Sequence, residues 1–351
     1  MDGHSGSRDG LRPRLRSSGE DGVGGPLACD TGRVPTFCRH GRLLANCPIC
    51  SKADVPARAA TPARPARNRS GVVRTPKASS GIRVRRVERA PEDGYDNPLV
   101  PGLRASADGV RLADELAFAV ARLEELATDP PGLYAEVAGA GDAEEATWLA
   151  FLVAFVGPGR GTDPWSGIAA ARVPWAGGAP PPLERAEPGP RSAVGTPRSA
   201  EAPAAYRAWA ARAGSQRAGL HGEPDWEPNR RFARTFERLA LPGFPRGPRY
   251  DFLVTLGALG IAAVEAGTLA VGRDATDPVV GAAKRVLGIG DAINLERRAT
   301  ELAAGTGVPF AALDLALFNF AVAFEDRATM GAATAVDPAV RAAIGAALGV
   351  S

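Results

Sequence analysis

Residues Leu239–Gly257 read "LALPGFPRGPRYDFLVTLG" and join two apolar, helix-like stretches through a turn rich in glycine, proline and arginine. Before the turn, "NRRFARTFERLA" (229–240) places Phe232, Phe236 and Leu239 on one helical stripe. After it, a helix is expected at about 249–265. A turn between helices ordinarily needs one glycine and a cap, but this one holds two glycines and three prolines within residues 242–248. The stretch therefore predicts a helical hairpin whose turn has a further use.

One such use is to bind an anion. Glycine lets the backbone approach a phosphate, and the free N–H groups and dipole at a helix start attract negative charge. Gly243 is the candidate for close approach, and Arg246 and Arg249 could add side-chain contacts. Pro245 lacks an N–H, so a tight turn without a ligand remains the alternative.

A basic helix face is expected directly before this turn. Arginine side chains at 230, 231, 234 and 238 should be exposed, and Arg234 and Arg238 are the candidate contacts to a nucleic-acid backbone. A solvated basic face without a partner is the alternative.

The rest of the C-terminal part also reads as helical. Helices are expected at about 112–127, 144–155, 204–213, 278–287, 292–304, 309–324 and 338–348, and no stretch shows convincing β alternation. "AGGAPPPLERAEPGPRSAVGTPRSA" (176–200) interrupts the pattern and is expected to be a long surface loop within the domain. The sequence predicts an all-α domain over residues 105–351.

The first 104 residues are rich in Arg, Pro, Gly and Ser and are expected to be mostly disordered, as segment 1–37 and as a basic linker, 53–104. Residues 58–89 hold ten basic side chains and one acidic one, which suits either a solvated tail or a nucleic-acid-binding arm.

Between these segments, residues 38–52 carry a metal-binding pattern. Cys38, His40, Cys47 and Cys50 form C-x-H-x6-C-x2-C, two close ligand pairs of the kind that hold a tetrahedral structural zinc ion. Cys29 is a fifth candidate ligand, and a reduced, unliganded cysteine cluster is the alternative.

Three Asp-Pro pairs mark expected helix starts. Asp163, Asp277 and Asp337 each precede a proline, which is typical of an N-cap followed by the first helical residue. Asp277 could also serve as an acid–base or electrostatic residue at the mouth of a cleft. Lys284 follows two turns later on the same helical face and could contact phosphate, or it could be a solvated surface lysine.

Four segments in order resemble the helix-hairpin-helix DNA glycosylase superfamily. They are "VAFVGPGRGTDPW" with Thr162–Asp163, "LPGF" at the hairpin, "TDPVVGAAKRVLGIGD" with Asp277, Lys284 and Arg285, and "ALDLALFNFA". The resemblance covers about residues 111–350. It implies a glycosylase-like helical scaffold, with Asp277 as the essential aspartate. The lysine of lyase-type members falls on Gly247, so strand cleavage through a Schiff base is not expected.

More closely, the same stretches resemble the alpha-glutamyl/putrescinyl thymine pyrophosphorylases, clade three. This resemblance implies an enzyme that replaces pyrophosphate on a 5-(pyrophosphoryloxymethyl)pyrimidine in DNA by an amine such as glutamate or putrescine. Asp277, Lys284 and Asp163 become the candidate catalytic residues, and Gly243, Arg246, Arg249, Arg234, Arg238 and Arg285 the candidate contacts to DNA or phosphate.

Two other functions stay open. A monofunctional DNA glycosylase would use Asp277 to stabilise charge developing on the sugar, and a non-enzymatic, zinc-containing DNA-binding protein would have an inactive pocket. The sequence shows no signal peptide or membrane span, so a cytoplasmic location is expected.

Overall fold

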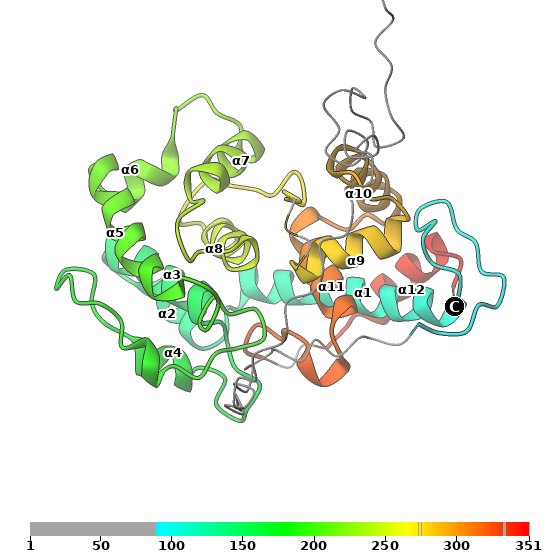
Figure 1. Ribbon diagram of the computed structural model, residues 1–351, viewed down its shortest axis with the longest axis horizontal. Coiled ribbons are helices and arrows are strands. Elements are labelled where there is room, and N and C mark those ends of the chain that lie inside the picture. Colours follow the sequence, from blue (N-terminus) through cyan, green and yellow to red (C-terminus); the bar gives the residue numbers. More distant parts are fainter. Residues whose placement is uncertain (1–88, 273, 275, 333–334, 351) are drawn as a thin grey trace, which may run out of the picture. The chain divides into compact units, whose positions relative to one another are not determined.

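The computed structural model of the protein describes residues 89–272, 274, 276–332 and 335–350. Within these ranges every regular element is helical, so the expected all-α class is confirmed (Figure 1). The α-helices are α1 Ser106–Thr128, α2 Leu133–Gly139, α3 Ala143–Val156, α4 Ser166–Ala171, α5 Ala202–Ala213, α6 Gln216–His221, α7 Pro228–Arg238, α8 Arg246–Ala258, α9 Pro278–Leu287, α10 Ala292–Thr306, α11 Phe310–Ala321 and α12 Pro338–Ala347. Short 3-10 turns lie at η2 Leu183–Arg185, η3 Ser199–Glu201 and η4 Phe324–Asp326.

The helices bury their apolar residues in two hydrophobic clusters. The first draws mainly on α2–α8, and the second on α1 and α9–α12. Helix α1 joins them, because Leu112 and Leu116 lie in the second cluster whereas Leu126 lies in the first. Val100 and Leu103 are also buried in the second cluster, so packed structure begins before residue 105.

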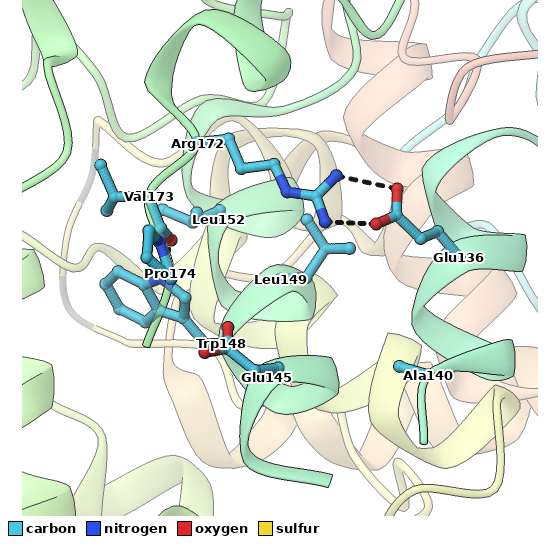
Figure 2. Close-up of a pocket in the computed structure, with 9 residues that line it drawn as sticks. All are labelled: Glu136, Ala140, Glu145, Trp148, Leu149, Leu152, Arg172, Val173 and Pro174. Atoms are coloured by element: carbon cyan, nitrogen blue, oxygen red, sulfur yellow. Dashed lines mark hydrogen bonds and ion pairs between the residues drawn. The ribbon is translucent and has the colours of Figure 1, made fainter. Parts of the chain in front are cut away.

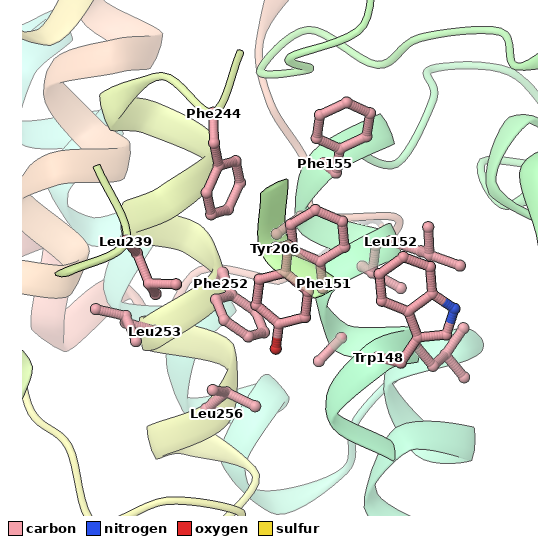
Figure 3. Packing of buried hydrophobic residues seen from close by; sticks show 14 of the residues in the cluster. Trp148, Phe151, Leu152, Phe155, Tyr206, Leu239, Phe244, Phe252, Leu253 and Leu256 are labelled. Atoms are coloured by element: carbon pink, nitrogen blue, oxygen red, sulfur yellow. The ribbon is translucent and has the colours of Figure 1, made fainter. Parts of the chain in front are cut away.

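Helix α3 is the centre of the first cluster. Every residue from Ala146 to Val156 is buried, as its nearly uninterrupted apolar sequence predicts. Asp142 caps its start by accepting hydrogen bonds from two backbone N–H groups. Aromatic rings from α3, α5 and α8 meet around Phe151, which stacks on Tyr206 with ring centroids 4.2 Å apart (Figure 3). This packing fixes α8 against α3 and thereby positions the start of α8.

The proline-rich loop at 176–200 is more than a surface loop. The amides of Gly189 and Ala193 donate to the carbonyls of Val156 and Phe155, which lie at the end of α3 and would otherwise lack partners. Ala193 is fully buried, and Arg191 is buried as well. The expectation of a surface loop was therefore wrong at Arg191 and Ala193, where the loop packs against the end of α3, and it holds for the exposed residues on either side.

Several helix boundaries also differ from expectation; α1, for example, begins at Ser106 and not at about 112. Helix α8 ends at Ala258 instead of continuing to 265, since Gly260 reverses the chain at a φ of +69°. Asp163 is not the N-cap of α4, which begins at Ser166 with Trp165 at the cap position.

Among the described residues, no single helix is long and apolar enough to cross a membrane. Helices α10 and α11 reach that length and composition only as a pair, which is bent by 106°.

Candidate functional site

The hairpin turn packs against the chain's own loop. Gly243 adopts a φ of +70°, and a Cβ at this position would lie 2.0 Å from the carbonyl oxygen of Arg198. Arg198 directly precedes η3, and its carbonyl oxygen accepts the amide of Glu201, the last residue of η3. The close approach that the sequence assigned to a phosphate is thus made to the backbone at 198–199.

Beyond the turn, Arg246 turns its side chain into the protein. Its guanidinium is 8% exposed and donates to the Asp314 carboxylate and to the carbonyls of Leu269 and Ala270. Its Nη1 is buried without a hydrogen-bond partner among the described residues and lies 3.8 Å from Oδ2 of Asp277. The Nη1 of Arg246 is therefore able to donate a hydrogen bond to a ligand.

A second buried arginine comes from the proline-rich loop. Arg191 binds both carboxylate oxygens of Asp251 at 2.7 Å and donates to Asp314 at 2.6 Å. Its own Nη1 is also buried without a hydrogen-bond partner in the described part of the chain. Asp314, 1% exposed, is the carboxylate that both arginines share.

Asp277 completes what we call the Arg–Asp network, which consists of Arg191, Arg246, Asp251, Asp277 and Asp314. As expected, Asp277 is the N-cap of α9, and its Oδ1 accepts the amides of Val279 at 2.8 Å and Val280 at 3.3 Å. Its Oδ2 makes no hydrogen bond to any described residue, although the side chain is only 10% exposed. At 3.8 Å the Oδ2 and the Arg246 Nη1 attract each other without a hydrogen bond.

The network joins the two hydrophobic clusters. Asp251 and Arg246 lie on α8, which packs in the first cluster, and Asp314 lies on α11, which packs in the second. Burial raises the pKa of Asp251 against the opposing effect of Arg191. Burial also opposes the charge of Arg191, but the carboxylates of Asp251 and Asp314 outweigh it and raise its pKa. Both arginines of the network are therefore held as cations.

Arg249 stands beside this network without a carboxylate of its own. Its guanidinium lies 3.9 Å from the centre of the Phe236 ring, and its buried Nε has no hydrogen-bond partner among the described residues. Burial, together with the positive charge of Arg246, lowers the pKa of Arg249 to about 10. Of the two arginines predicted as anion contacts in the turn, Arg249 is the one that forms no ion pair with a carboxylate in the described part of the chain.

The other predicted residues lie away from the network. Lys284 is in the last turn of α9, about 10 Å along the helix axis from Asp277. Arg285 binds Asp108 of α1 at 2.7 Å. Asp163 is exposed and accepts the amide of Trp165 at 3.0 Å. The structure therefore places Arg246 beside Asp277 and Arg249 beside Arg246, and holds Lys284, Arg285 and Asp163 elsewhere.

The basic face of α7 is formed by Arg230, Arg234 and Arg238, which are exposed. Arg230 and Arg238 both lie near one partner, the Trp226 ring, with their guanidinium carbons 5.3 and 5.2 Å from its centre. The expectation that Arg231 is exposed was wrong. Its guanidinium donates to backbone carbonyls, including that of Ala263 at 2.8 Å, because the loop after α8 packs on this side of α7.

The predicted zinc ligands Cys38, His40, Cys47 and Cys50, together with Cys29, lie outside the described residues. Within the described ranges, no group of three or more His, Cys, Asp or Glu side chains is arranged to hold a metal ion.

Sequence reasoning did not find Arg191, Asp251 or Asp314. Asp314 carried a signal, since it is the one charged residue in the apolar run "FAALDLALFNFA". Arg191 carried none, because its pairing depends on residues 60 and 123 positions away.

No protein-family model, no curated protein and no solved structure matches this chain.

Proposed function

We propose that the chain modifies pyrimidine bases in DNA and that its reaction centre lies between Asp277 and Arg246. The supporting observation is that Asp277 Oδ2 and Arg246 Nη1 face each other at 3.8 Å, one an acceptor and one a donor, each without a hydrogen-bond partner among the described residues. The order of the motifs, which resembles the helix-hairpin-helix glycosylases, supports the choice of substrate class.

The proposed reaction replaces pyrophosphate on a 5-(pyrophosphoryloxymethyl)pyrimidine by an amine such as glutamate or putrescine. The amine nitrogen donates its lone pair to the exocyclic carbon, and the bond from that carbon to the pyrophosphate oxygen breaks with its electrons on the oxygen. Asp277 Oδ2 takes the proton that the nitrogen loses. Arg246 and Arg249 attract the leaving pyrophosphate.

The helix cap suits Asp277 to this role. Because Oδ1 already accepts two backbone amides, the carboxylate is held in one orientation, and Oδ2 is the atom left for proton transfer. Lys284 and Arg285 lie toward the other end of α9 and are assigned to contacts with DNA phosphates rather than to the reacting atoms.

DNA would lie against the basic face of α7. Arg230, Arg234 and Arg238 recur every four residues, so they form one positively charged stripe on the helix. Such a stripe would attract a phosphate backbone without reading its base sequence. A structural zinc ion at Cys38, His40, Cys47 and Cys50 and the basic segment after it would add to substrate capture.

A second candidate is a monofunctional DNA glycosylase. It is favoured by the surroundings of Asp277, whose carboxylate accepts the cap amides and lies 3.8 Å from the Arg246 guanidinium. A carboxylate of this kind could stabilise positive charge developing on the sugar.

A third candidate is a DNA-binding protein without catalysis. It is favoured by the small cavity beside the network, which Arg191 and Asp251 help to line and which has a volume of about 20 Å³. This is room for one water molecule, so a flipped base would require the surrounding loops to move.

Mass spectrometry of nucleosides distinguishes the three. The full-length protein is incubated with duplexes carrying thymine, 5-hydroxymethyluracil or its pyrophosphorylated form, with and without amines. A mass shift from pyrophosphate to amine supports the transferase, free base with abasic sites supports the glycosylase, and unchanged nucleosides with retained DNA binding support the binding protein.

A pair of variants makes the test specific. Asp277→Asn should abolish the product, whereas Asp337→Asn should not, because Asp337 is also an N-cap before proline but lies outside the network. Equal loss in both variants would contradict the assignment of Asp277 to the reaction.

A further inference from the structure

A second pocket lies apart from the Arg–Asp network, between α2, α3 and the segment that follows α4 (Figure 2). Its volume is about 200 Å³, and its lining shares no residue with the network. The apolar part of the lining consists of Ala140, Trp148, Leu149, Leu152, Val173 and Pro174. A dry cavity of about 150 Å³ is known to hold benzene, so this pocket has room for one ring or a short aliphatic chain.

The charged side chains of the lining differ in their hydrogen-bond partners. Arg172 and Glu136 form a two-bond ion pair along one side, visible as two dashed lines in Figure 2. Glu145 makes no direct ion pair with a described residue, although the charges of Arg172 and Arg207 both lie near enough to interact with it. Its two oxygens accept only the backbone amides of Trp175 and Ala176, at 2.9 and 3.2 Å.

Several donors that surround the pocket are already engaged. The Trp148 Nε1 donates to the carbonyl of Val173 at 2.8 Å. Pro174 has no amide hydrogen, and each terminal nitrogen of Arg172 donates one hydrogen bond to Glu136, which holds the guanidinium at that side of the pocket. Each carboxylate oxygen of Glu145 has a further lone pair, so Glu145 can accept hydrogen bonds from a ligand.

The formal charge of the lining points the same way. Two carboxylates and one guanidinium leave the lining with a net charge of −1, which the neighbouring Arg207 offsets in part. Arg207, outside the lining, places its guanidinium 4.4 and 4.6 Å from the centres of the Trp148 and Trp175 rings and donates to the carbonyls of Trp175 and Pro174. The aromatic surface behind the pocket therefore already stabilises one cation, as the negative faces of indole rings do.

From these observations we infer that this pocket binds a small organic cation, namely a primary ammonium group on a single ring or short aliphatic chain. The ammonium group donates to Glu145, and the apolar body lies against Trp148, Leu149 and Leu152. The inference rests on the lining alone and is independent of the proposed reaction.

Binding of benzylamine tests it directly. Isothermal titration calorimetry and ligand-observed NMR on the full chain compare benzylamine, protonated at pH 7, with its neutral analogue benzyl alcohol and with benzoate. We expect benzylamine to bind about tenfold more tightly than benzyl alcohol or better, because a hydrogen bond to a charged group adds about that factor. Benzoate should bind most weakly.

Three variants assign the site. Glu145→Gln should remove the preference for benzylamine over benzyl alcohol, because the amide keeps the shape of the side chain without its charge. Ala140→Phe, at an exposed residue of the lining, should weaken all three ligands by obstructing the pocket, and Glu184→Gln, an exposed control outside the lining, should change nothing. Circular dichroism confirms that each variant is folded.

Three results would overturn the inference. Benzoate binding as tightly as benzylamine would mean that Arg172 determines the ligand, and unchanged selectivity in Glu145→Gln would mean that the cation binds elsewhere. Absence of any binding at millimolar concentrations would remove the site altogether.

Discussion

The packing role of the hairpin turn can be measured by substituting Gly243 with alanine. At a φ of +70° any side chain is strained, by roughly 1–2 kcal/mol, and the lower entropy of the unfolded alanine chain returns about 0.4–1 kcal/mol. The new Cβ would also lie 2.0 Å from the Arg198 carbonyl oxygen, a backbone atom that accepts the amide of Glu201. Moving that backbone loosens the start of η3, at the cost of one or two hydrogen bonds of about 1 kcal/mol each.

Gly260 supplies the matched control. Its φ is +69°, and a Cβ there would have no neighbour within 4 Å, so Gly260→Ala reports the conformational strain alone. We expect a loss of roughly 1 kcal/mol for Gly260→Ala and about 3 kcal/mol for Gly243→Ala. In a domain of this size the difference corresponds to about 4–8 °C in Tm.

Urea unfolding followed by circular dichroism gives both values from the same preparation. Equal losses in the two variants would refute the idea that Gly243 serves contact with residues 198–199. Such a result would favour the alternative that the turn binds an anion, and phosphate titration of both variants would test this.

Further predictions concern charged groups. Asp314→Asn should lower the free energy of unfolding by about 3–5 kcal/mol, because it leaves two buried guanidinium groups without a shared carboxylate. Urea titrations measure this loss. A loss under 1 kcal/mol would mean that the two arginines are stabilised by other groups. Arg249→Met should raise stability by about 1 kcal/mol at pH 7, because it removes a buried cation that has no carboxylate, while it weakens binding to DNA in salt titrations; reduced stability would show that its contact with the Phe236 ring outweighs burial. Burial, with Arg217 and Arg231, lowers the pKa of His221, so its contribution to stability is present above the pKa of the unfolded chain and is lost as pH falls. His221→Gln should therefore flatten the decline of stability from about pH 7 to pH 5, and an unchanged slope would assign that decline to other groups.

Local chemistry was readable from the sequence. The Asp-Pro pairs at 277 and 337 predicted helix starts that the structure confirms, and α9 has the predicted bounds 278–287. A cap and the following proline act within four residues, so nothing distant is needed to recognise them. The same reasoning failed at Asp163, where the helix begins two residues later than the pattern predicts.

Helical periodicity also identified which faces are apolar. Phe232, Phe236 and Leu239 are buried as predicted, and α3 is buried on all sides. Such patterns follow from 3.6 residues per turn and from the transfer of apolar surface out of water. They determine that these segments are helical and which residues face a core, but they do not determine which helix packs against which.

Only the tertiary structure determined which arginines are buried and which are exposed. By composition Arg231, Arg234 and Arg246 are equivalent, yet Arg234 is exposed, Arg231 binds backbone carbonyls, and Arg246 is buried against Asp314 of α11. A guanidinium is buried only where a carboxylate or carbonyl compensates for its lost hydration. Those partners lie far away in the chain: Asp314 is 123 positions from Arg191, and the Met330 carbonyl that accepts from the buried Arg122 is 208 positions from it. Helix α1 packs against both α8 and α11, and this packing brings Arg246 of α8 within hydrogen-bonding distance of Asp314 of α11.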